Sequence, residues 1–211
     1  RGRYGDSTMM RLLVVVVLAS LSGCTSSLLE SKLPISVVYV MAAAPAENAA
    51  ANQSTLDLAI ALPTAAPGLD TERIAILHEA RRLDYYREAQ WGAALPQVVQ
   101  SLLVGSLQNQ KLFRSVTTEQ ARVTASYLLD LDIRDFQAEY ANDSSAPTVR
   151  VTLVASLIRI SDRKLIGMYP VTFTVLASAN RMSAVAAAFE SAARQAATSL
   201  GKQAADTIAK N

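Results

Sequence analysis

The sequence predicts an α+β fold: a mainly antiparallel sheet with two amphipathic helices packed on one face. Three long segments between residues 126 and 176 are rich in β-branched and apolar residues, as strands are. The connections between them are of hairpin length, which favours antiparallel pairing. Two further segments place apolar residues at helical spacing on one side only. Helices that cover one face of an antiparallel sheet would bury both apolar sets.

The N-terminal leader is expected to lie outside this fold. Leu12–Leu21 (LLVVVVLASL) follows Arg11 and two candidate initiators, Met9 and Met10. A ten-residue helix rises only about 15 Å, roughly half of the hydrocarbon thickness of a bilayer, so it cannot span one. A basic start, a short apolar run and small residues before a processing point are the parts of a secretory signal. Residues 1–8 (RGRYGDST) do not fit such a start, and we interpret them as upstream sequence.

The only cysteine of the chain stands at the end of this leader. Leu21-Ser22-Gly23-Cys24 resembles the bacterial lipobox, which implies thioether diacylation of Cys24, cleavage before it and acylation of the new amino terminus. Two or more acyl chains anchor a protein stably, at about 0.8 kcal/mol per buried CH₂, whereas one chain does so only marginally. The alternatives are an ordinary leader followed by an unrelated cysteine, or a buried core cysteine. Thr25, in place of the Asp of inner-membrane lipoproteins, favours the outer membrane.

Composition limits the function classes. The leader contains Arg1, Arg3, Arg11 and Asp6, so 17 of the 20 basic residues and 17 of the 18 acidic residues remain after its removal. A neutral chain has no electrostatic basis for binding nucleic acid. With one cysteine, no disulfide can form within a monomer. We expect upstream residues and a removed signal peptide over 1–23, a lipidated tether over 24–34 and a single α+β domain over 35–211.

The first half of this domain is predicted to hold three strands and a helix. The expected strands are 35–41 (ISVVYVM), 56–62 (LDLAIAL) and 73–77 (RIAIL). Residues 42–54, low in complexity, are expected to form a loop. Residues 82–91 are assigned no element, and Trp91 is interpreted as part of the approach to the helix.

The first helix is predicted over 95–109. Its apolar side is marked by helical spacing of Leu95, Val98, Val99, Leu102, Leu103 and Ser106. Pro96 suits the first helical position, and Gly105 would allow close packing on the sheet. In the second half, strands are expected at 112–117, 126–140, 148–160 and 164–176. The last helix is predicted over 183–209, capped by Asn180 or Ser183. Its buried stripe comprises Val185, Phe189, Ala192, Ala196 and Leu200.

The strand at 126–140 changes its apolar face partway along. Leu129, Leu131 and Ile133 occupy odd positions, whereas Phe136, Ala138 and Tyr140 occupy even ones. A β-bulge near Arg134 and Asp135 would return both sets to one face, and this is the favoured interpretation. The alternative is that Phe136 and Tyr140 present an aromatic patch to a partner.

The inventory of reactive side chains predicts no catalytic, cofactor or metal site. His78 is the only histidine, and the only cysteine is expected to carry lipid. No glycine-rich phosphate loop or nucleophile elbow is present in the sequence. Asp130 and Asp132 share one strand face, with Asp135 nearby, which suggests either a weak cation site or, preferably, a solvated outer face.

Several spaced motifs resemble one family. They are GLDTERI (68–74), RLDYY (82–86), Trp91, Leu95-Pro96, IRDFQAEY (133–140), MSAV (182–185) and AAFE (187–190). This set resembles the ABC-type transport auxiliary lipoprotein family, the PqiC-type proteins. The resemblance implies a non-catalytic subunit of an intermembrane lipid transport system. Such a subunit docks a periplasmic MCE-domain protein at the outer membrane, and through it an ABC permease and ATPase that uses the ATP.

Six residues are candidates for contacts with such a partner: Tyr85, Tyr86, Arg134, Asp135, Phe136 and Tyr140. If the adjacent tyrosines lie on a strand, one faces inward and the outward one is the better candidate. Arg134 and Asp135 could instead form a structural ion pair. Leu83, Trp91, Leu95 and Phe189 are most simply core residues.

Two other functions stay open. One is an outer-membrane assembly lipoprotein that binds lipopolysaccharide or a β-barrel partner. The other is a lipid-anchored periplasmic hydrolase, which would depend on His78. Whether the domain forms a homo-oligomer is open as well.

Overall fold

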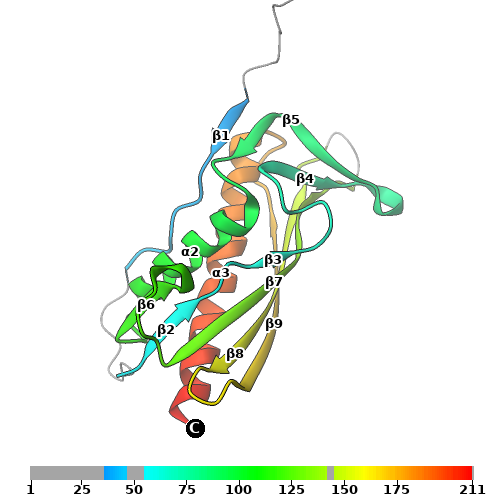
Figure 1. Cartoon of the computed structure of the whole chain (residues 1–211). Coiled ribbons are helices and arrows are strands. Elements are labelled where there is room, and N and C mark those ends of the chain that lie inside the picture. Colours follow the sequence, from blue (N-terminus) through cyan, green and yellow to red (C-terminus); the bar gives the residue numbers. More distant parts are fainter. Residues whose placement is uncertain (1–35, 47–54, 142–144, 211) are drawn as a thin grey trace, which may run out of the picture. The chain divides into compact units, whose positions relative to one another are not determined.

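The computed structural model describes residues 36–46, 55–141 and 145–210 (Figure 1). The leader, Cys24, Thr25 and the tether lie outside the described residues, as does most of the 42–54 insert. The described strands are β1 (Val37–Tyr39), β2 (Asp57–Ile60), β3 (Thr64–Ala65), β4 (Arg73–Leu77), β5 (Leu83–Trp91), β6 (Ser115–Thr118), β7 (Tyr127–Glu139), β8 (Thr148–Arg159) and β9 (Lys164–Leu176). The helices are α2 (Leu95–Gln110) and α3 (Met182–Ala209), with short 3₁₀ turns η1 (Glu79–Arg81) and η2 (Glu119–Ala121).

The sheet is organised around β7. One edge of β7 pairs with β8 along its whole length, and β8 pairs with β9, both antiparallel. The other edge is shared in succession by β2, β3 and β4, all parallel to β7. From there β6 extends the sheet beside β2, and β5 and then β1 extend it beside β4 (Figure 1). The sheet therefore branches at one strand.

The sheet is mixed, which corrects the prediction of a mainly antiparallel one. Among the described strands, five pairings are parallel and three are antiparallel. The antiparallel prediction is right for β7, β8 and β9, where the connections are short. In the first half only β4 and β5 pair in this way, and β2, β3 and β4 are parallel to β7, because the chain between them and β7 contains α2. A connection through a helix is long enough to return the chain in the parallel direction.

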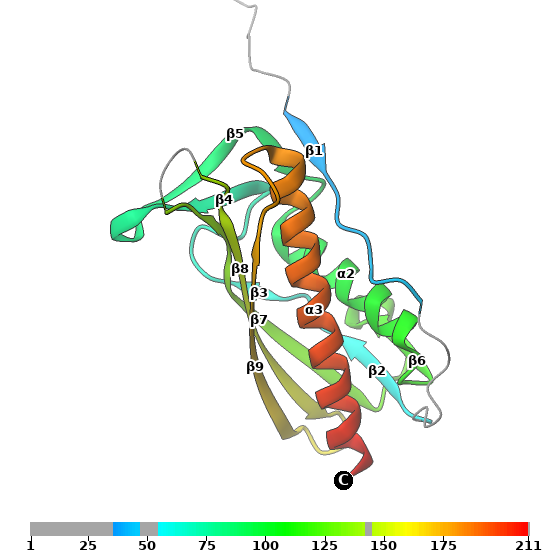
Figure 2. The same ribbon diagram turned by 180° about the vertical axis from the view of Figure 1, so that it is seen from behind.

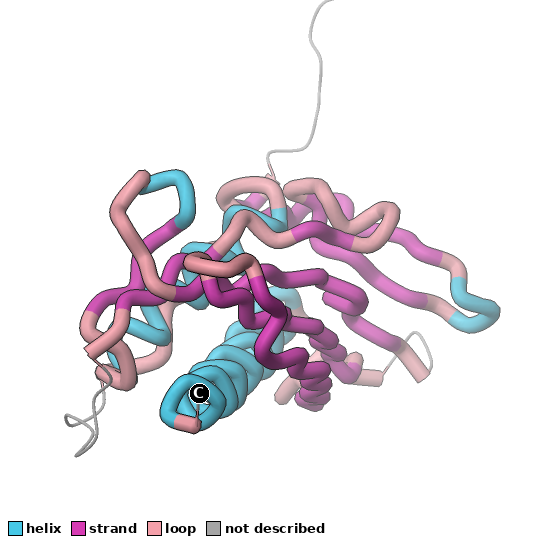
Figure 3. The backbone as a smooth tube through the Cα atoms, turned by 60° about the horizontal axis from the view of Figure 1, so that its bottom comes forward, coloured by secondary structure: helices cyan, strands magenta, loops and turns pink. Residues whose placement is uncertain are grey.

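Both helices lie on the same, concave face of the curled sheet. α3 packs on β8 and β9, and α2 packs on α3 and against β2, β3 and β6 (Figures 2 and 3). The predicted stripe of α3 is confirmed, because each of its members is at most 1% exposed: Val185, Phe189, Ala192, Ala196 and Leu200. Burial of this stripe on the sheet is the main apolar contact of the helix.

The helix termini agree with the prediction in position but not in capping. α2 begins at Leu95 with Pro96 in its first turn, as predicted, and ends at Lys111 in a left-handed conformation (φ 53°). The residue before α3 is Arg181, which makes no side-chain cap. Neither Asn180 nor Ser183 therefore caps α3, and Asn180 instead accepts a hydrogen bond from Tyr140.

The predicted β-bulge is confirmed. The register between β7 and β8 shifts between Ile133 and Asp135, so Ile133 and Phe136 both face the helices and are both buried. Phe136 stacks on Phe189 at 5.1 Å between ring centroids. Trp91 meets both rings edge-on, at 6.1 Å and 5.3 Å. Phe136 is therefore a core residue, which corrects its proposed role as a partner contact.

The sequence missed two strands. The sequence predicts no element over residues 82–91, but β5 occupies most of them. Its pattern alternates poorly, since the strand is polar over Arg87 and Glu88 and pairs irregularly with β4. β3 has only two residues, too few for any periodicity. β6 begins at Ser115, later than the strand predicted at 112–117.

Candidate partner-binding site

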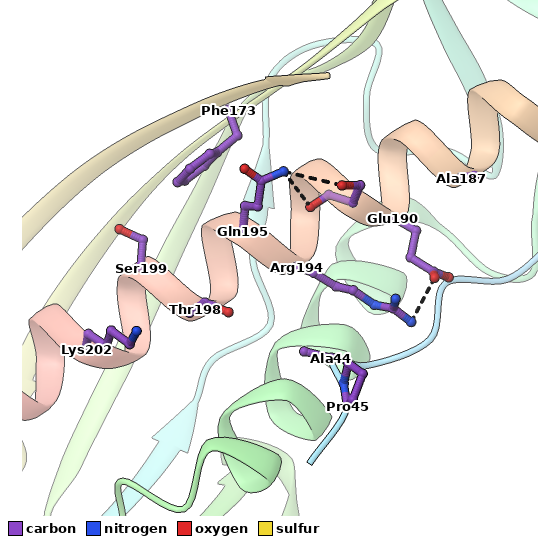
Figure 4. Close-up of a pocket in the computed structure, with 11 residues that line it drawn as sticks. Ala44, Pro45, Phe173, Ala187, Glu190, Arg194, Gln195, Thr198, Ser199 and Lys202 are labelled. Atoms are coloured by element: carbon purple, nitrogen blue, oxygen red, sulfur yellow. Dashed lines mark hydrogen bonds and ion pairs between the residues drawn. The ribbon is translucent and has the colours of Figure 1, made fainter. Parts of the chain in front are cut away.

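A hollow of about 710 Å³ lies over the side of α3 that faces away from the sheet (Figure 4). Its floor is formed by side chains from successive turns of α3, among them Ser191, Gln195, Thr198, Ser199 and Lys202. Phe173 of β9 borders one side of the hollow, and Ala44 and Pro45 border the other. Short polar side chains therefore line a concave surface between a strand and a separate stretch of extended chain.

That stretch, residues 42–46, is called the strap here. It crosses the two helices without regular secondary structure. The Ala42 backbone N–H donates to Glu190 Oε2 at 2.9 Å, and Arg194 Nε donates to the Ala42 carbonyl oxygen at 2.9 Å. Glu190 and Arg194 also form an i,i+4 ion pair at 2.8 Å. One ion pair on α3 thus holds both backbone polar groups of a single strap residue.

α2 holds the next part of the strap in the same way. The Ala44 N–H donates to Ser106 Oγ at 3.0 Å, and Asn109 Nδ2 donates to the Ala44 carbonyl oxygen at 2.7 Å. A Cβ at Gly105 would meet the Ala43 Cβ at 2.8 Å, closer than two such carbons approach. Gly105 therefore serves the strap and not the sheet, which corrects the earlier expectation. Side chains of both helices thus satisfy the backbone polar groups of an extended segment.

Tyr86 and Tyr140 form a second polar feature at the end of β7. Their hydroxyl oxygens are 2.9 Å apart, and Tyr140 donates to Asn180 Oδ1 at 3.0 Å. Because the single Tyr140 proton is used on Asn180, Tyr86 must donate to Tyr140. Burial raises the pKa of the Tyr86 hydroxyl, with the Tyr140 hydrogen bond adding to the effect. The pair ties β5, β7 and the segment before α3 together.

Tyr85 has different partners, as expected for the neighbour of Tyr86 on a strand. The Arg73 guanidinium lies over its ring at 3.7 Å, and its hydroxyl donates to the Gly68 carbonyl oxygen at 2.8 Å. Gly68 has a φ of 87°, a conformation that favours glycine. Tyr85 therefore fixes the turn before β4, and it is half-buried rather than freely exposed.

Arg134 and Asp135 do not pair with each other, which corrects that expectation. Arg134 Nε lies 3.1 Å from Asp132 Oδ2, and Asp135 Oδ1 accepts from Gln137 Nε2 at 3.3 Å. With Phe136 in the core, the six predicted contact residues do not form one site. The structure brings only Tyr86 and Tyr140 into direct contact.

The titratable side chains of the described residues are dispersed. His78 Nε2 lies 3.9 Å from Asp84 Oδ2, and Asp132 is engaged by Arg134. Over residues 36–46, 55–141 and 145–210, no three His, Cys, Asp or Glu side chains are placed to hold a metal ion. No helix in that same part of the chain has the length and apolarity needed to cross a bilayer.

Sequence reasoning missed the hollow on α3 and the strap. One local signal was available: Glu190 and Arg194 stand four residues apart, the spacing of an ion pair on a helix surface. The partner of that pair lies far away in the sequence, in a segment predicted as a loop. Nothing in the local pattern of residues 42–46 indicates which surface they would contact.

Comparison with known proteins agrees with this architecture. Protein XCC0632 from Xanthomonas campestris, of the DUF330 family, is 26% identical, with a TM-score of 0.75 over 83% of this chain and 98% of that one. An uncharacterized protein of known structure shares the fold, at 12% identity and a TM-score of 0.64 over 80% of this chain and 98% of its own. No curated protein sequence matches significantly. The family model for the ABC-type transport auxiliary lipoprotein component matches residues 39–201, most of the sequence, and the chain belongs to that family.

Proposed function

We propose that this protein is a lipid-anchored, non-catalytic subunit of an ABC/MCE-type intermembrane lipid transport system, and that it docks the periplasmic MCE component at the outer membrane. The observation that carries the proposal is the family match over residues 39–201. The lipobox at Leu21–Cys24 and the absence of Asp at position 25 support the anchor and its membrane. Hydrolysis of ATP would take place on another subunit.

The tether would keep the domain near the membrane. Residues 24–36 reach at most about 45 Å when fully extended. A partner bound by the domain would therefore also be held close to the membrane surface. Substituting Cys24 by Ser should release the protein into the soluble fraction. An unmodified thiol at Cys24 in the wild-type protein, found by mass spectrometry, would contradict the anchor, and fractionation with the inner membrane would contradict its location.

The hollow on α3 is the surface that we assign to the MCE component. α3 has 28 residues and is about 42 Å long, so it offers an extended contact. The contacts of the strap support this assignment, because side chains of α2 and α3 hold the backbone groups of Ala42 and Ala44. Gln195, Thr198 and Ser199 continue that row of polar groups beyond the strap. We assign to them an extended segment of the partner, held through its peptide groups.

Crosslinking in cells tests this assignment. A photoreactive amino acid at Gln195 or Ser199 of the full-length lipoprotein should capture the MCE component. Thr174 on β9 supplies the matched control, because it is exposed whereas its neighbour Phe173 borders the hollow. Capture of a β-barrel protein or lipopolysaccharide from Gln195 would favour the assembly-lipoprotein alternative instead. Equal capture from Gln195 and Thr174 would refute a specific docking surface.

The proposed lack of catalysis rests on His78, the one side chain that a histidine-dependent hydrolase would need. In the structure its Nε2 lies 3.9 Å from Asp84 Oδ2. His78→Ala should leave the transport phenotype unchanged. Loss of the phenotype with normal protein levels would support the hydrolase alternative.

A further inference from the structure

A second hollow, of about 520 Å³, lies on the outer face of the sheet, away from the helices. Tyr127 and Leu129 of β7 are buried in the core, so Leu128 between them points outward. The strand registers place Ala59 of β2, Leu128 of β7, Ile158 of β8 and Leu165 of β9 in one row across four strands. An apolar row thus crosses the face that would normally be polar.

This outer hollow is partly covered by the segment after η2. The hollow is lined by three residues of this segment, Val123, Thr124 and Ala125, and by Ile160, which follows the end of β8. Val123 is 58% exposed and Ile160 is 42% exposed. Apolar side chains that gather around an open hollow mark a binding surface more often than isolated ones do. The volume also falls within the roughly 300–1,000 Å³ typical of small-molecule pockets.

Two opposite charges stand at this hollow. Arg163, at the tip of the β8–β9 hairpin, and Glu119, at the start of η2, both line it. Among the described residues neither forms an ion pair, with the other or elsewhere, whereas the neighbouring Arg159 and Asp162 pair at 3.3 Å. An apolar slot bordered by an uncompensated cation and an uncompensated anion complements a zwitterion that carries a hydrocarbon chain.

A protein segment fits this hollow less well. β2, β7 and β8 each have neighbours on both sides at this point, so they expose no free backbone edge for strand addition. The lining offers side-chain hydrocarbon and two charges. These are the groups that recognise an amphiphile of membrane origin.

We propose that the outer hollow binds one acyl chain of a phospholipid with a phosphoethanolamine head group. The chain lies along Leu128 and Ile158, Arg163 binds the phosphate and Glu119 binds the ammonium group. This inference goes beyond the docking role and does not depend on it. It gives the subunit direct contact with lipid.

Photocrosslinking in cells tests the proposal with the full-length lipoprotein. With p-benzoylphenylalanine at Val123, mass spectrometry should find phosphatidylethanolamine attached to the protein. Leu176 is the matched control, because it is an apolar residue, 68% exposed, that does not line the hollow. Lipid captured equally at both positions would reveal mere proximity to the membrane and would overturn the proposal. Capture of protein instead of lipid at Val123 would overturn it as well.

Substitutions then test each contact, with the crosslinker kept at Val123. Ile158→Ala should lower lipid capture about tenfold, the loss expected when roughly two methylene contacts are removed. Arg163→Asn should also lower capture, because asparagine tolerates the left-handed backbone (φ 55°) but carries no charge. Arg81→Asn is its control, since Arg81 has a similar φ of 60° outside the hollow. Unchanged capture in the Ile158 and Arg163 variants would refute the site.

Head-group selectivity and independence from the partner complete the test. Glu119→Gln should shift the captured lipid from phosphatidylethanolamine towards phosphatidylglycerol, because the ammonium group loses its counter-charge. An unaltered lipid ratio would refute the role of Glu119. In cells that lack the MCE component, capture at Val123 should persist. The experiments can therefore refute the lipid site without refuting the docking proposal, and they can refute the docking proposal without refuting the lipid site.

Discussion

The two sides of α3 differ in how they hold their neighbours. Towards the sheet, Phe189 is fully buried and packs against Phe136 and Trp91, with ring centroids 5.1 Å and 5.3 Å away. On the other side, half-buried Glu190 and Arg194 hold the strap through hydrogen bonds and an ion pair. Burial of aromatic area stabilises a fold strongly, whereas partly exposed hydrogen bonds contribute little net free energy. The first side therefore contributes most of the stability that α3 gives to the domain, and the second contributes less.

The contact of α3 with α2 is intermediate. Ala193, Ala197 and Gly201 let the helices approach closely, and Gln110 of α2 fills the space beside Gly201. Gln110 Nε2 donates to the Ala197 carbonyl oxygen at 3.4 Å, while its Oε1 has no partner among the described residues. This contact depends on the small residues of α3, and it leaves the Gln110 Oε1 atom without a hydrogen-bond partner among the described residues.

The largest effect is expected on the sheet side. Phe189→Ala should lower the free energy of unfolding by about 3–5 kcal/mol, because it opens a cavity between Trp91 and Phe136. Urea denaturation measures the change. Phe173→Ala, at the half-buried edge of the hollow, is the control and should have a smaller effect. Equal losses for the two variants would contradict the proposed division between the sides of α3.

A smaller loss is expected where the helices touch. Gly201→Val should destabilise the domain by about 1–3 kcal/mol, because a Cβ there would meet Gln110 Oε1 at 2.3 Å. Thermal unfolding measures it. Gln110→Ala in the same chain should recover part of the loss, since the two positions are coupled. Strict additivity of the two substitutions would show that the clash lies elsewhere.

On the strap side, a substitution should change the local protection of a backbone amide from hydrogen exchange but hardly change the free energy of unfolding. Glu190→Ala removes the acceptor of the Ala42 N–H, so hydrogen exchange at that amide should become faster. The free energy of unfolding should change by less than about 1 kcal/mol, as for other exposed ion pairs. Lys202→Ala, which lines the same hollow, is the control for exchange. A global loss as large as that of Phe189→Ala would mean that the strap belongs to the core.

The smallest effect concerns Gln110 alone. Gln110→Met keeps a similar volume and removes the buried Oε1 that has no partner among the described residues. Stability should stay the same or rise by up to about 1 kcal/mol, because no unsatisfied polar atom remains there. Urea denaturation measures the free energy of unfolding of this variant. A clear decrease would contradict the interpretation, because it would show that the hydrogen bond from Gln110 Nε2 to the Ala197 carbonyl oxygen contributes more than its length suggests.

The two helices and the long strands of the second half were largely predictable, because their signals are local. The apolar stripe of α3, the helix start at Pro96 and the change of face at Arg134 each depend on residues close together in the sequence. The pairing of β2, β3 and β4 was not predictable, since strands of two to five residues carry too little pattern to identify a neighbour. β5 was missed because its polar residues break the alternation.

The candidate sites were less accessible to sequence reasoning. The predicted tyrosines, Tyr85, Tyr86 and Tyr140, make contacts within the domain, and nothing local reveals those contacts. The strap joins residues 42 and 44 to side chains of both helices, a relation created only by folding. The outer apolar row likewise emerges only when the registers of four strands are known.

The use of one edge of β7 by three earlier strands also sets the order in which the domain is completed. β2, β3 and β4 leave the ribosome well before β7. β4 can already pair with β5 and β2 with β6, but the strand that joins these pairs into one sheet is missing until β7 arrives. Parallel pairings between distant segments form slowly. These early strand pairs are therefore joined late, and the N-terminal half of the sheet becomes continuous only when β7 is in place.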